Sequence, residues 1–268
     1  MKRWSSRLRF ALRAVAAALF VLPILWMVAA ALHPPGVALP RSLSLLPEDP
    51  SLATFGRVWD LVPLGRFGLN SLLVAAVAVP LTVVTSSWAG LAMARLPRPS
   101  QRRWVVLSLA VLMVPGAALW ASRFLVYEQL GLIDTLAALV APAVMGSSPF
   151  YVLMFYRAFR RIPASIYDAA LIDGAGVWQT WGRVALPMVR PTAVGVALLS
   201  LILYWGDYTA PLLYLGDQDR YTLPVALELL SQLSRADWPL LMAGATLVTA
   251  VPVAIFLLLQ PYFARIGR

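Results

Sequence analysis

Residues that commonly carry out catalysis or hold metal ions are scarce in this sequence. Its 268 residues include no cysteine, one histidine (His33) and one lysine (Lys2). The lack of cysteine excludes disulfides, zinc–thiolate sites and thiol nucleophiles within the chain. Lys2 lacks the glycine-rich context of a phosphate-binding loop, and His33 stands beside Pro34 and Pro35 at the end of an apolar run. We therefore predict no catalytic residue, no metal site and no cofactor bound by this chain.

One acidic residue lies among aromatic residues in a long apolar segment. Asp207 follows Tyr204 and Trp205 and precedes Tyr208. A centred charge costs roughly 2.5–3.5 kcal/mol on membrane-insertion scales, so such residues usually face a cavity or a partner. Aromatic rings can stack on sugar faces while a carboxylate accepts hydrogen bonds from hydroxyl groups. The cluster is a candidate for a substrate pathway; the alternative is an aromatic belt at the membrane surface.

A second candidate site is the polar segment of residues 157–190. Ser165 and Asp168 have a spacing that resembles a capping box, which predicts a short helix over residues 167–173. Gly174 is placed to end this helix in the left-handed conformation. A second short helix is indicated by apolar residues on one face before Pro187, namely Val177, Trp181, Val184 and Ala185. The pair has little core of its own, so its apolar face must pack on the same chain or on a partner.

The composition indicates that membrane helices position both sites. Apolar residues make up 60% of the chain and charged residues 13%, against about 45–50% and 25% in soluble domains. A spanning helix needs about 20 mostly apolar residues. Six segments qualify: residues 14–32, 67–94, 104–122, 135–156, 191–214 and 238–264. The sequence therefore predicts an all-α polytopic membrane protein, with one six-helix transmembrane domain over residues 14–264.

The basic residues predict the orientation of these helices. Sixteen of the 22 Lys and Arg residues lie in the N-terminal segment 1–13, between spans two and three, between spans four and five, or in the tail 265–268. The positive-inside rule then places both termini and residues 157–190 in the cytoplasm. The net charge of +10 is accounted for by this topology. Nucleic-acid binding is not expected, because no basic patch alternates with aromatic residues on a soluble surface.

Residues 157–190 resemble the EAA loop of ABC importer permeases. The family pattern is Glu-Ala-Ala, a glycine a few residues later and a Leu-Pro pair further on. The matching residues here are Asp168, Ala169, Ala170, Asp173, Gly174, Ala175, Leu186 and Pro187. The Asp-Gly-Ala form is similar to sugar-import permeases of the maltose-transporter type, and residues 54–59, 70–72, 131–135 and 205–207 also resemble that subfamily. Two departures are Asp168 in place of Glu and Gly206 in place of Asn.

The resemblance implies a type I importer permease in the cytoplasmic (inner) membrane that translocates a sugar or oligosaccharide. It implies four partners besides the lipid bilayer: a second, unlike permease subunit, two ATP-binding subunits that hold ATP and Mg²⁺, and an extracytoplasmic solute-binding protein. Residues 157–190 are then the cytoplasmic coupling loop, a helix–turn–helix that docks in a cleft of an ATPase.

Three other functions stay open at this point. The same machinery could carry a glycerol phosphate ester, a polyamine, phosphate or another small solute, although an anionic cargo favours cationic groups and only Arg123 lies near the outer half. A stand-alone secondary transporter is disfavoured, because the chain shows no clear repeat and only one embedded acid. A membrane-embedded enzyme is disfavoured by the missing catalytic residues.

Overall fold

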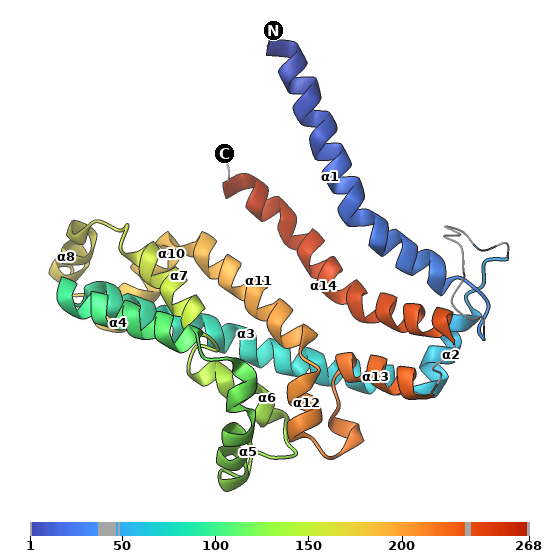
Figure 1. Cartoon of the computed structure of the whole chain (residues 1–268). Helices are drawn as coiled ribbons and strands as arrows, with labels where there is room; N and C mark the ends of the chain where they lie inside the picture. The colour runs from blue at the N-terminus through green and yellow to red at the C-terminus, as the bar shows by residue number, and fades with distance from the viewer. Residues whose placement is uncertain (1, 37–46, 48, 234–236, 267–268) are drawn as a thin grey trace. The chain divides into compact units, whose positions relative to one another are not determined.

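The computed structural model describes residues 2–36, 47, 49–233 and 237–266, and every regular element in these ranges is a helix (Figure 1). Residues 267 and 268 of the predicted cytoplasmic tail lie outside the described residues. In chain order the elements are α1 (Lys2–Ala31), α2 (Ala53–Leu61), α3 (Leu64–Arg95), α4 (Arg98–Leu112), η1 (Gly116–Leu119), α5 (Trp120–Gln129), α6 (Leu136–Val144), α7 (Pro149–Phe159), α8 (Ala164–Ile172), α9 (Val177–Gln179), η2 (Thr180–Ala185), α10 (Leu186–Met188), α11 (Arg190–Gly206), α12 (Thr209–Tyr214), η3 (Gln218–Arg220), α13 (Leu223–Leu233) and α14 (Trp238–Ile266).

The described helices support a membrane-spanning chain. Four segments are long and apolar enough to cross a bilayer: Leu8–Ala31, Leu64–Arg95, Leu136–Phe159 and Trp238–Leu258. Two bent helix pairs, α4 with η1–α5 and α9–α10 with α11, raise the number to six if each pair is one span. The all-α, polytopic prediction is therefore confirmed, and the first, second, fourth and sixth predicted spans each coincide with one of the four segments.

The predicted third span, residues 104–122, is wrong as a single helix. α4 ends at Leu112, and the helical segment that begins at Gly116 is bent by 89° from it. Pro115 holds the position before that segment. Proline has no N–H to donate, and it disfavours helical conformation at the residue before it. The chain therefore turns at this proline instead of continuing straight.

The predicted fifth span, residues 191–214, is also interrupted. α11 ends at Gly206 and α12 begins at Thr209. One carboxylate oxygen of Asp207 accepts hydrogen bonds from the backbone N–H groups of Thr209, at 3.0 Å, and Ala210, at 3.1 Å. Short acidic side chains compete with the helical ladder for such donors and start new helices. Asp207 therefore separates two helices.

The chain divides into two compact units. The first contains Met1–Gly65 and Leu223–Val253. Its main polar anchor is the buried carboxylate of Asp237, which accepts hydrogen bonds from the N–H groups of Gly36, at 2.9 Å, and Leu240, at 3.2 Å, and forms an ion pair with Arg57 at 3.5 Å. One side chain thus links the end of α1, helix α2 and the start of α14, because a buried carboxylate needs several partners.

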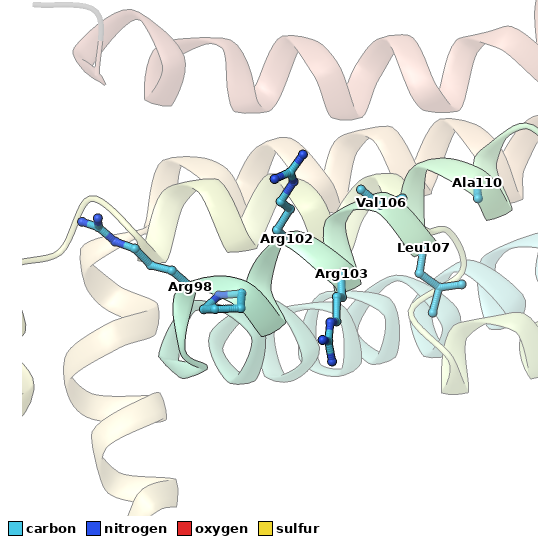
Figure 2. A pocket seen from close by; sticks show the side chains of 7 residues that line it. Arg98, Arg102, Arg103, Val106, Leu107 and Ala110 are labelled. Carbon is cyan, nitrogen blue, oxygen red and sulfur yellow. The ribbon is translucent and has the colours of Figure 1, made fainter.

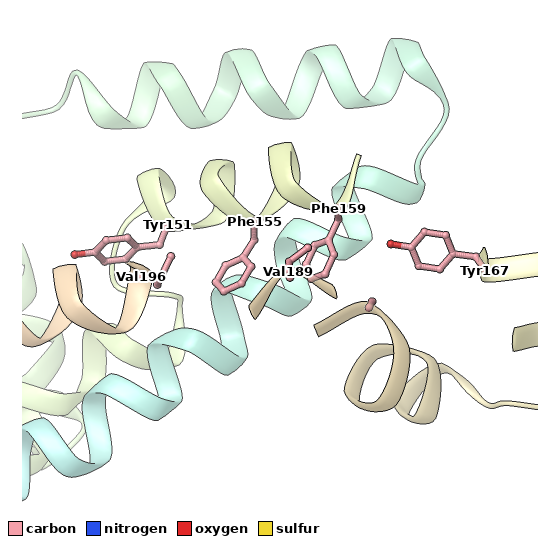
Figure 3. Packing of buried hydrophobic residues seen from close by; sticks show 7 residues of the cluster. Tyr151, Phe155, Phe159, Tyr167, Val189 and Val196 are labelled. Atoms are coloured by element: carbon pink, nitrogen blue, oxygen red, sulfur yellow. The ribbon is translucent and has the colours of Figure 1, made fainter. Parts of the chain in front are cut away.

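The second unit contains Arg66–Thr222 and Ala254–Arg268 and holds both candidate sites. Tyr151, Phe155 and Phe159 recur every four residues along α7 and are buried, as Figure 3 shows. They pack with Val189 and Val196 at and beyond the start of α11, in a cluster that also contains Tyr167 of α8. Spacing of four residues puts side chains on one helix face, so α7 links a membrane helix to the segment 157–190.

Candidate functional site

The first helix of the predicted coupling loop begins earlier than its sequence indicates. α8 starts at Ala164, with Pro163 in the N-cap position and no side-chain hydrogen bond to the cap. The predicted capping box of Ser165 and Asp168 is therefore wrong. Ser165 already lies inside the first turn, where its side chain is no longer positioned to cap the free N–H groups. The Asp168 side chain is exposed.

The end of α8 agrees with the prediction. Gly174 has φ +76°. Its N–H donates to the carbonyl of Leu171 at 3.0 Å, and the N–H of Ala175 donates to the carbonyl of Ala170 at 2.9 Å. This pair of bonds is the Schellman motif, which requires a residue in the left-handed region. The glycine therefore fixes the direction in which the chain leaves α8.

The second helix of the loop is longer than predicted. α9, η2 and α10 form one segment over Val177–Met188, in which η2 is a π-helical turn. Pro187 does not end it, because this proline lies in the first turn of α10, where a missing N–H is tolerated. The following helix α11 is bent from this segment by 85°. The loop helix is thus joined almost directly to an apolar helix of the bundle.

Aromatic contacts hold the loop against the end of α3. The ring nitrogen of Trp181 donates to the hydroxyl of Ser87 at 3.1 Å. The ring of Trp88 meets those of Trp178 and Trp181 edge-on, with centroids 4.8 and 5.4 Å apart. Such aromatic pairs contribute about 0.5–1.5 kcal/mol beyond their buried area. The second loop helix is therefore held against α3 by aromatic packing and one indole hydrogen bond.

A cation–π interaction attaches α8 to the same end of α3. The Arg95 guanidinium lies 4.5 Å from the centre of the Tyr167 ring. Burial raises the pKa of Tyr167, and the positive charge of Arg95 opposes this effect in part. The phenol is therefore neutral near pH 7. A cavity of about 590 Å³ remains between α3 and the loop, with Trp88, Arg95, Asp168 and Trp178 in its lining.

The tip of the loop remains exposed although it is apolar. The exposed fractions are 73% for Leu171, 86% for Ile172, 80% for Val177 and 65% for Trp178; we call these four residues the apolar tip. Val177 was predicted to share the packed face and does not, because it opens the second helix next to the turn. Trp181 and Val184 are half-buried and Ala185 is buried, as predicted. The loop is anchored at its base and presents apolar side chains at its end.

The four residues of the second candidate site have different surroundings. Tyr204 is half-buried, Trp205 is buried and Tyr208 is exposed, while the Asp207 carboxylate accepts hydrogen bonds from the first two N–H groups of α12. The Tyr204 hydroxyl lies 2.7 Å from the hydroxyl of Ser147, which lies 2.5 Å from that of Thr82. Ser147 has φ +59°, an uncommon conformation for a residue other than glycine. The backbone therefore places this hydroxyl between two others, an arrangement that sequence spacing does not reveal.

Two of the stretches that carry the family resemblance hold a polar turn in place. Asp134 accepts hydrogen bonds from the N–H groups of Gly216 and Asp217, both at 3.0 Å, and forms an ion pair with Arg220 at 2.9 Å. The amide of Asn70 donates to the carbonyls of residues 219 and 221, both at 2.9 Å. Residues 216–221 are therefore held from two sides.

These bonds lower the pKa of Asp134, chiefly through the Asp217 N–H; desolvation has the next largest effect and opposes it, while the Gly216 N–H and Arg220 lower the pKa further. A lowered pKa means that the carboxylate stabilises the turn above the unfolded-state pKa of about 3.9 and that this contribution is lost as the pH falls through the folded-state value.

We predict that Asp134→Asn unfolds at lower temperature than the parent at pH 7, and that the difference shrinks as the pH falls below about 4. Thermal unfolding of both proteins across pH checks this, and a difference independent of pH would contradict it.

In the described ranges, no group of three or more His, Asp or Glu side chains is arranged to hold a metal ion.

Comparisons with known proteins agree with this architecture. Residues 86–266 match the family described as "Binding-protein-dependent transport system inner membrane component". The chain is 31% identical over 237 residues to the diacetylchitobiose uptake system permease protein NgcG of Streptomyces coelicolor, covering 88% of this chain and 78% of that protein. It is 27% identical over 265 residues to the lactose transport system permease protein LacG of Rhizobium radiobacter, covering 98% and 95%.

A solved structure shows the same fold. A chain of the bacterial ABC transporter involved in the import of the acidic polysaccharide alginate superposes with a TM-score of 0.74 at 20% identity, covering 97% of both chains. The family match extends over more than half of the chain and includes the whole loop. This chain therefore belongs to the family of binding-protein-dependent transport system inner membrane components, the permeases of ABC importers.

Proposed function

We propose that this chain is the permease subunit of an ATP-driven importer that carries a sugar or oligosaccharide into the cytoplasm. The observation that carries the proposal is the apolar tip, which is exposed at the end of a loop whose base is fixed to α3. Exposed apolar side chains on a polar, basic segment mark a surface for a protein partner. The names of NgcG and LacG, which concern diacetylchitobiose and lactose, support the carbohydrate cargo.

The partner of this loop is an ATP-binding subunit. Asp168 and Asp173, together with the apolar tip, form the docking surface, and ATP and Mg²⁺ bind in the partner. Motion of the ATPase reaches the membrane helices through Trp181 and Tyr167, because rings that pack against α3 transmit a displacement that a flexible loop would absorb. This role requires the loop and both termini to face the cytoplasm, as the distribution of basic residues predicts.

Three other partners complete the machine. A second, unlike permease subunit completes the pathway, and a second ATP-binding subunit docks on its loop. An extracytoplasmic solute-binding protein delivers the cargo, in keeping with the binding-protein-dependent family to which the chain belongs.

The hydroxyl chain of Thr82, Ser147 and Tyr204 is the pathway element that we assign to sugar passage. Hydroxyl groups both donate and accept hydrogen bonds, as sugar hydroxyls do. We predict that Tyr204→Phe reduces uptake about fivefold, which corresponds to the loss of one hydrogen bond of about 1 kcal/mol. Uptake by proteoliposomes of Tyr204→Phe, Ser147→Ala and the double variant measures this. Because both changes remove the same contact, the double variant should be little worse than either; additive losses would contradict the assignment.

The proposed function is tested by isolating the tagged full chain from gently solubilised native membranes. We expect an ATP-binding subunit and a second permease to be recovered with it, and ATP hydrolysis by this complex to rise when its binding protein and a sugar are added. Recovery of the chain alone in several mild detergents, with uptake driven by an ion gradient, would replace the importer by a secondary transporter. Hydrolysis stimulated by a polyamine or a phosphate ester instead of a sugar would keep the machine and correct the cargo.

A further inference from the structure

Five arginines converge on one cavity away from the loop tip. The cavity is about 900 Å³ in volume, and its lining includes Arg98 and Arg102 of α4 and Arg157, Arg160 and Arg161 at the end of α7. All five side chains are exposed. The lining contains no carboxylate, and within the part of the chain that the structure describes none of the five forms an ion pair. Like charges that line one cavity repel one another, so the arrangement favours an anion between them.

Hydrogen bonds through the side chains of Tyr156 and Gln101 connect the helices at the base of this cavity. Arg160 donates to the hydroxyl of the buried Tyr156 at 3.2 Å, and that hydroxyl donates to the side-chain oxygen of Gln101 at 3.0 Å. The amide of Gln101 donates in turn to the carbonyls of Ala94, at 3.1 Å, and Leu96, at 2.7 Å. The start of α4 and the end of α7 are thereby held together, and the side chain of Arg160 is positioned before any anion binds.

A second cavity, of about 790 Å³, continues from the same arginines along α4. Arg98 and Arg102 belong to its lining as well, followed by Val106, Leu107 and Ala110. Figure 2 shows the arginines at one end of the helix and the three apolar residues further along it. From Arg102 to Ala110 the helix rises about 12 Å, at about 1.5 Å per residue. Over this distance the lining changes from strongly basic to apolar. A lipid headgroup together with the first part of its acyl chains has a comparable length.

We propose that these two cavities bind an anionic phospholipid, with the phosphodiester between the five arginines and an acyl chain along the apolar face of α4. Arginine matches phosphate oxygens with two parallel N–H donors, and basic pockets between helices on the cytoplasmic side suit anionic headgroups. A free phosphate uses only the basic cavity and leaves the apolar one without a role. The assignment rests on the cytoplasmic placement of residues 157–161 given under the proposed function, but not on the cargo or on ATP.

Native mass spectrometry of the detergent-purified full chain, titrated with dioleoyl phosphatidylglycerol or with dioleoyl phosphatidylcholine, tests the proposal. The parent should retain phosphatidylglycerol in preference. The pair Arg102→Gln and Arg161→Gln should weaken that binding roughly 25-fold, at about fivefold for each arginine near an anionic lipid, and should weaken the binding of phosphatidylcholine less, because its choline group offsets the charge of the phosphate. The matched control, Arg13→Gln with Arg183→Gln, removes two exposed cytoplasmic-side charges outside the cavity and should bind as the parent does.

Each alternative outcome has a distinct signature. Equal weakening in the control pair would reduce the effect to net charge and overturn the site. Displacement of phosphatidylglycerol by inorganic phosphate at a concentration equal to that of the lipid would show that the apolar cavity adds nothing, and would assign the arginines to a free phosphate instead. Displacement of the lipid on assembly with the ATP-binding subunit would assign them to that protein. A lysine pair, Arg102→Lys with Arg161→Lys, checks the folding of the glutamine pair. It keeps the charges but loses the paired N–H donors, so it should bind phosphatidylglycerol more weakly than the parent and more tightly than the glutamine pair; binding as tight as the parent's would count against the paired-donor geometry, and binding no tighter than that of the glutamine pair would count against the charge attraction. Recovery of the ATP-binding subunit with the glutamine pair shows that the proposed function stands even if lipid binding is not found.

Discussion

Replacing Gly174 by valine should uncouple the proposed importer. At φ +76° a β-branched residue is a conformational outlier, and each such residue costs about 1–3 kcal/mol. The space around the position is open, because a Cβ atom on this residue would have no neighbour within 4 Å, so the strain comes from the backbone alone. The chain relieves it by breaking the two hydrogen bonds from Gly174 and Ala175, which redirects the turn between the loop helices. We expect recovery of the ATP-binding subunit to fall about tenfold, since 1.4 kcal/mol of lost docking energy has that effect.

Gly176 supplies the control for this variant. It lies two residues further on, also has open space around it, and has φ −67° and ψ 170°, which any residue adopts. Gly176→Val should therefore bind the ATP-binding subunit as the parent does. Both variants are compared by pull-down and by ATP-dependent uptake in proteoliposomes. Equal loss in the two variants would show that bulk at the tip matters and not the left-handed turn, and normal coupling in Gly174→Val would remove the loop from the docking role.

Hydropathy locates correctly the helices that consist of one uninterrupted apolar segment. α1, α3 and α14 are continuous apolar runs, and composition alone locates them. The errors occur where one residue changes the chain direction. Pro115 ends the helical run in the predicted third span, and Asp207 does so in the fifth by binding backbone N–H groups. Prolines inside membrane helices are often tolerated, so the sequence alone did not show which of them would break the helix.

The candidate loop was predictable where its chemistry is local. Gly174 ends α8 in the way that its position after a short helix indicates, because a Schellman turn depends on neighbouring residues only. The contact of Trp181 with Ser87 joins residues 94 positions apart, and the hydroxyl chain through Thr82, Ser147 and Tyr204 joins three segments that are distant in the sequence. The spacing of residues within one segment cannot reveal contacts between segments that are distant in the sequence. The exposed apolar tip likewise emerged only when the packed faces of both loop helices were known.

Gly90→Ala should destabilise the chain more than its single methyl group suggests. A Cβ atom at Gly90 of α3 would lie 2.6 Å from the Phe155 Cβ, 2.8 Å from the Tyr156 nitrogen and 3.0 Å from the Val152 carbonyl oxygen. These are backbone or near-backbone atoms of α7, so no side-chain rotation relieves the overlap. Small residues allow membrane helices to approach closely, and overpacking of this kind costs about 1–3 kcal/mol or more. We expect a lower unfolding temperature for the detergent-purified full chain.

The displacement of α7 also gives this variant a functional signature. Phe155 and Phe159 of α7 pack in the same cluster as Tyr167 of the first loop helix and Val189 at the end of the loop, so a shift of α7 away from α3 moves the base of the docking surface. Uptake should fall together with stability.

Gly195→Ala on α11 is the matched control: its Cβ would lie 3.9 Å from the Met154 Cε, an ordinary contact, and alanine favours a helix over glycine by about 0.8–1.0 kcal/mol. The two substitutions should therefore change the unfolding temperature in opposite directions, because one methyl group enters a closed helix contact and the other makes only an ordinary van der Waals contact. A fall of similar size in both would mean that α3 and α7 do not approach as closely at Gly90 as the geometry requires.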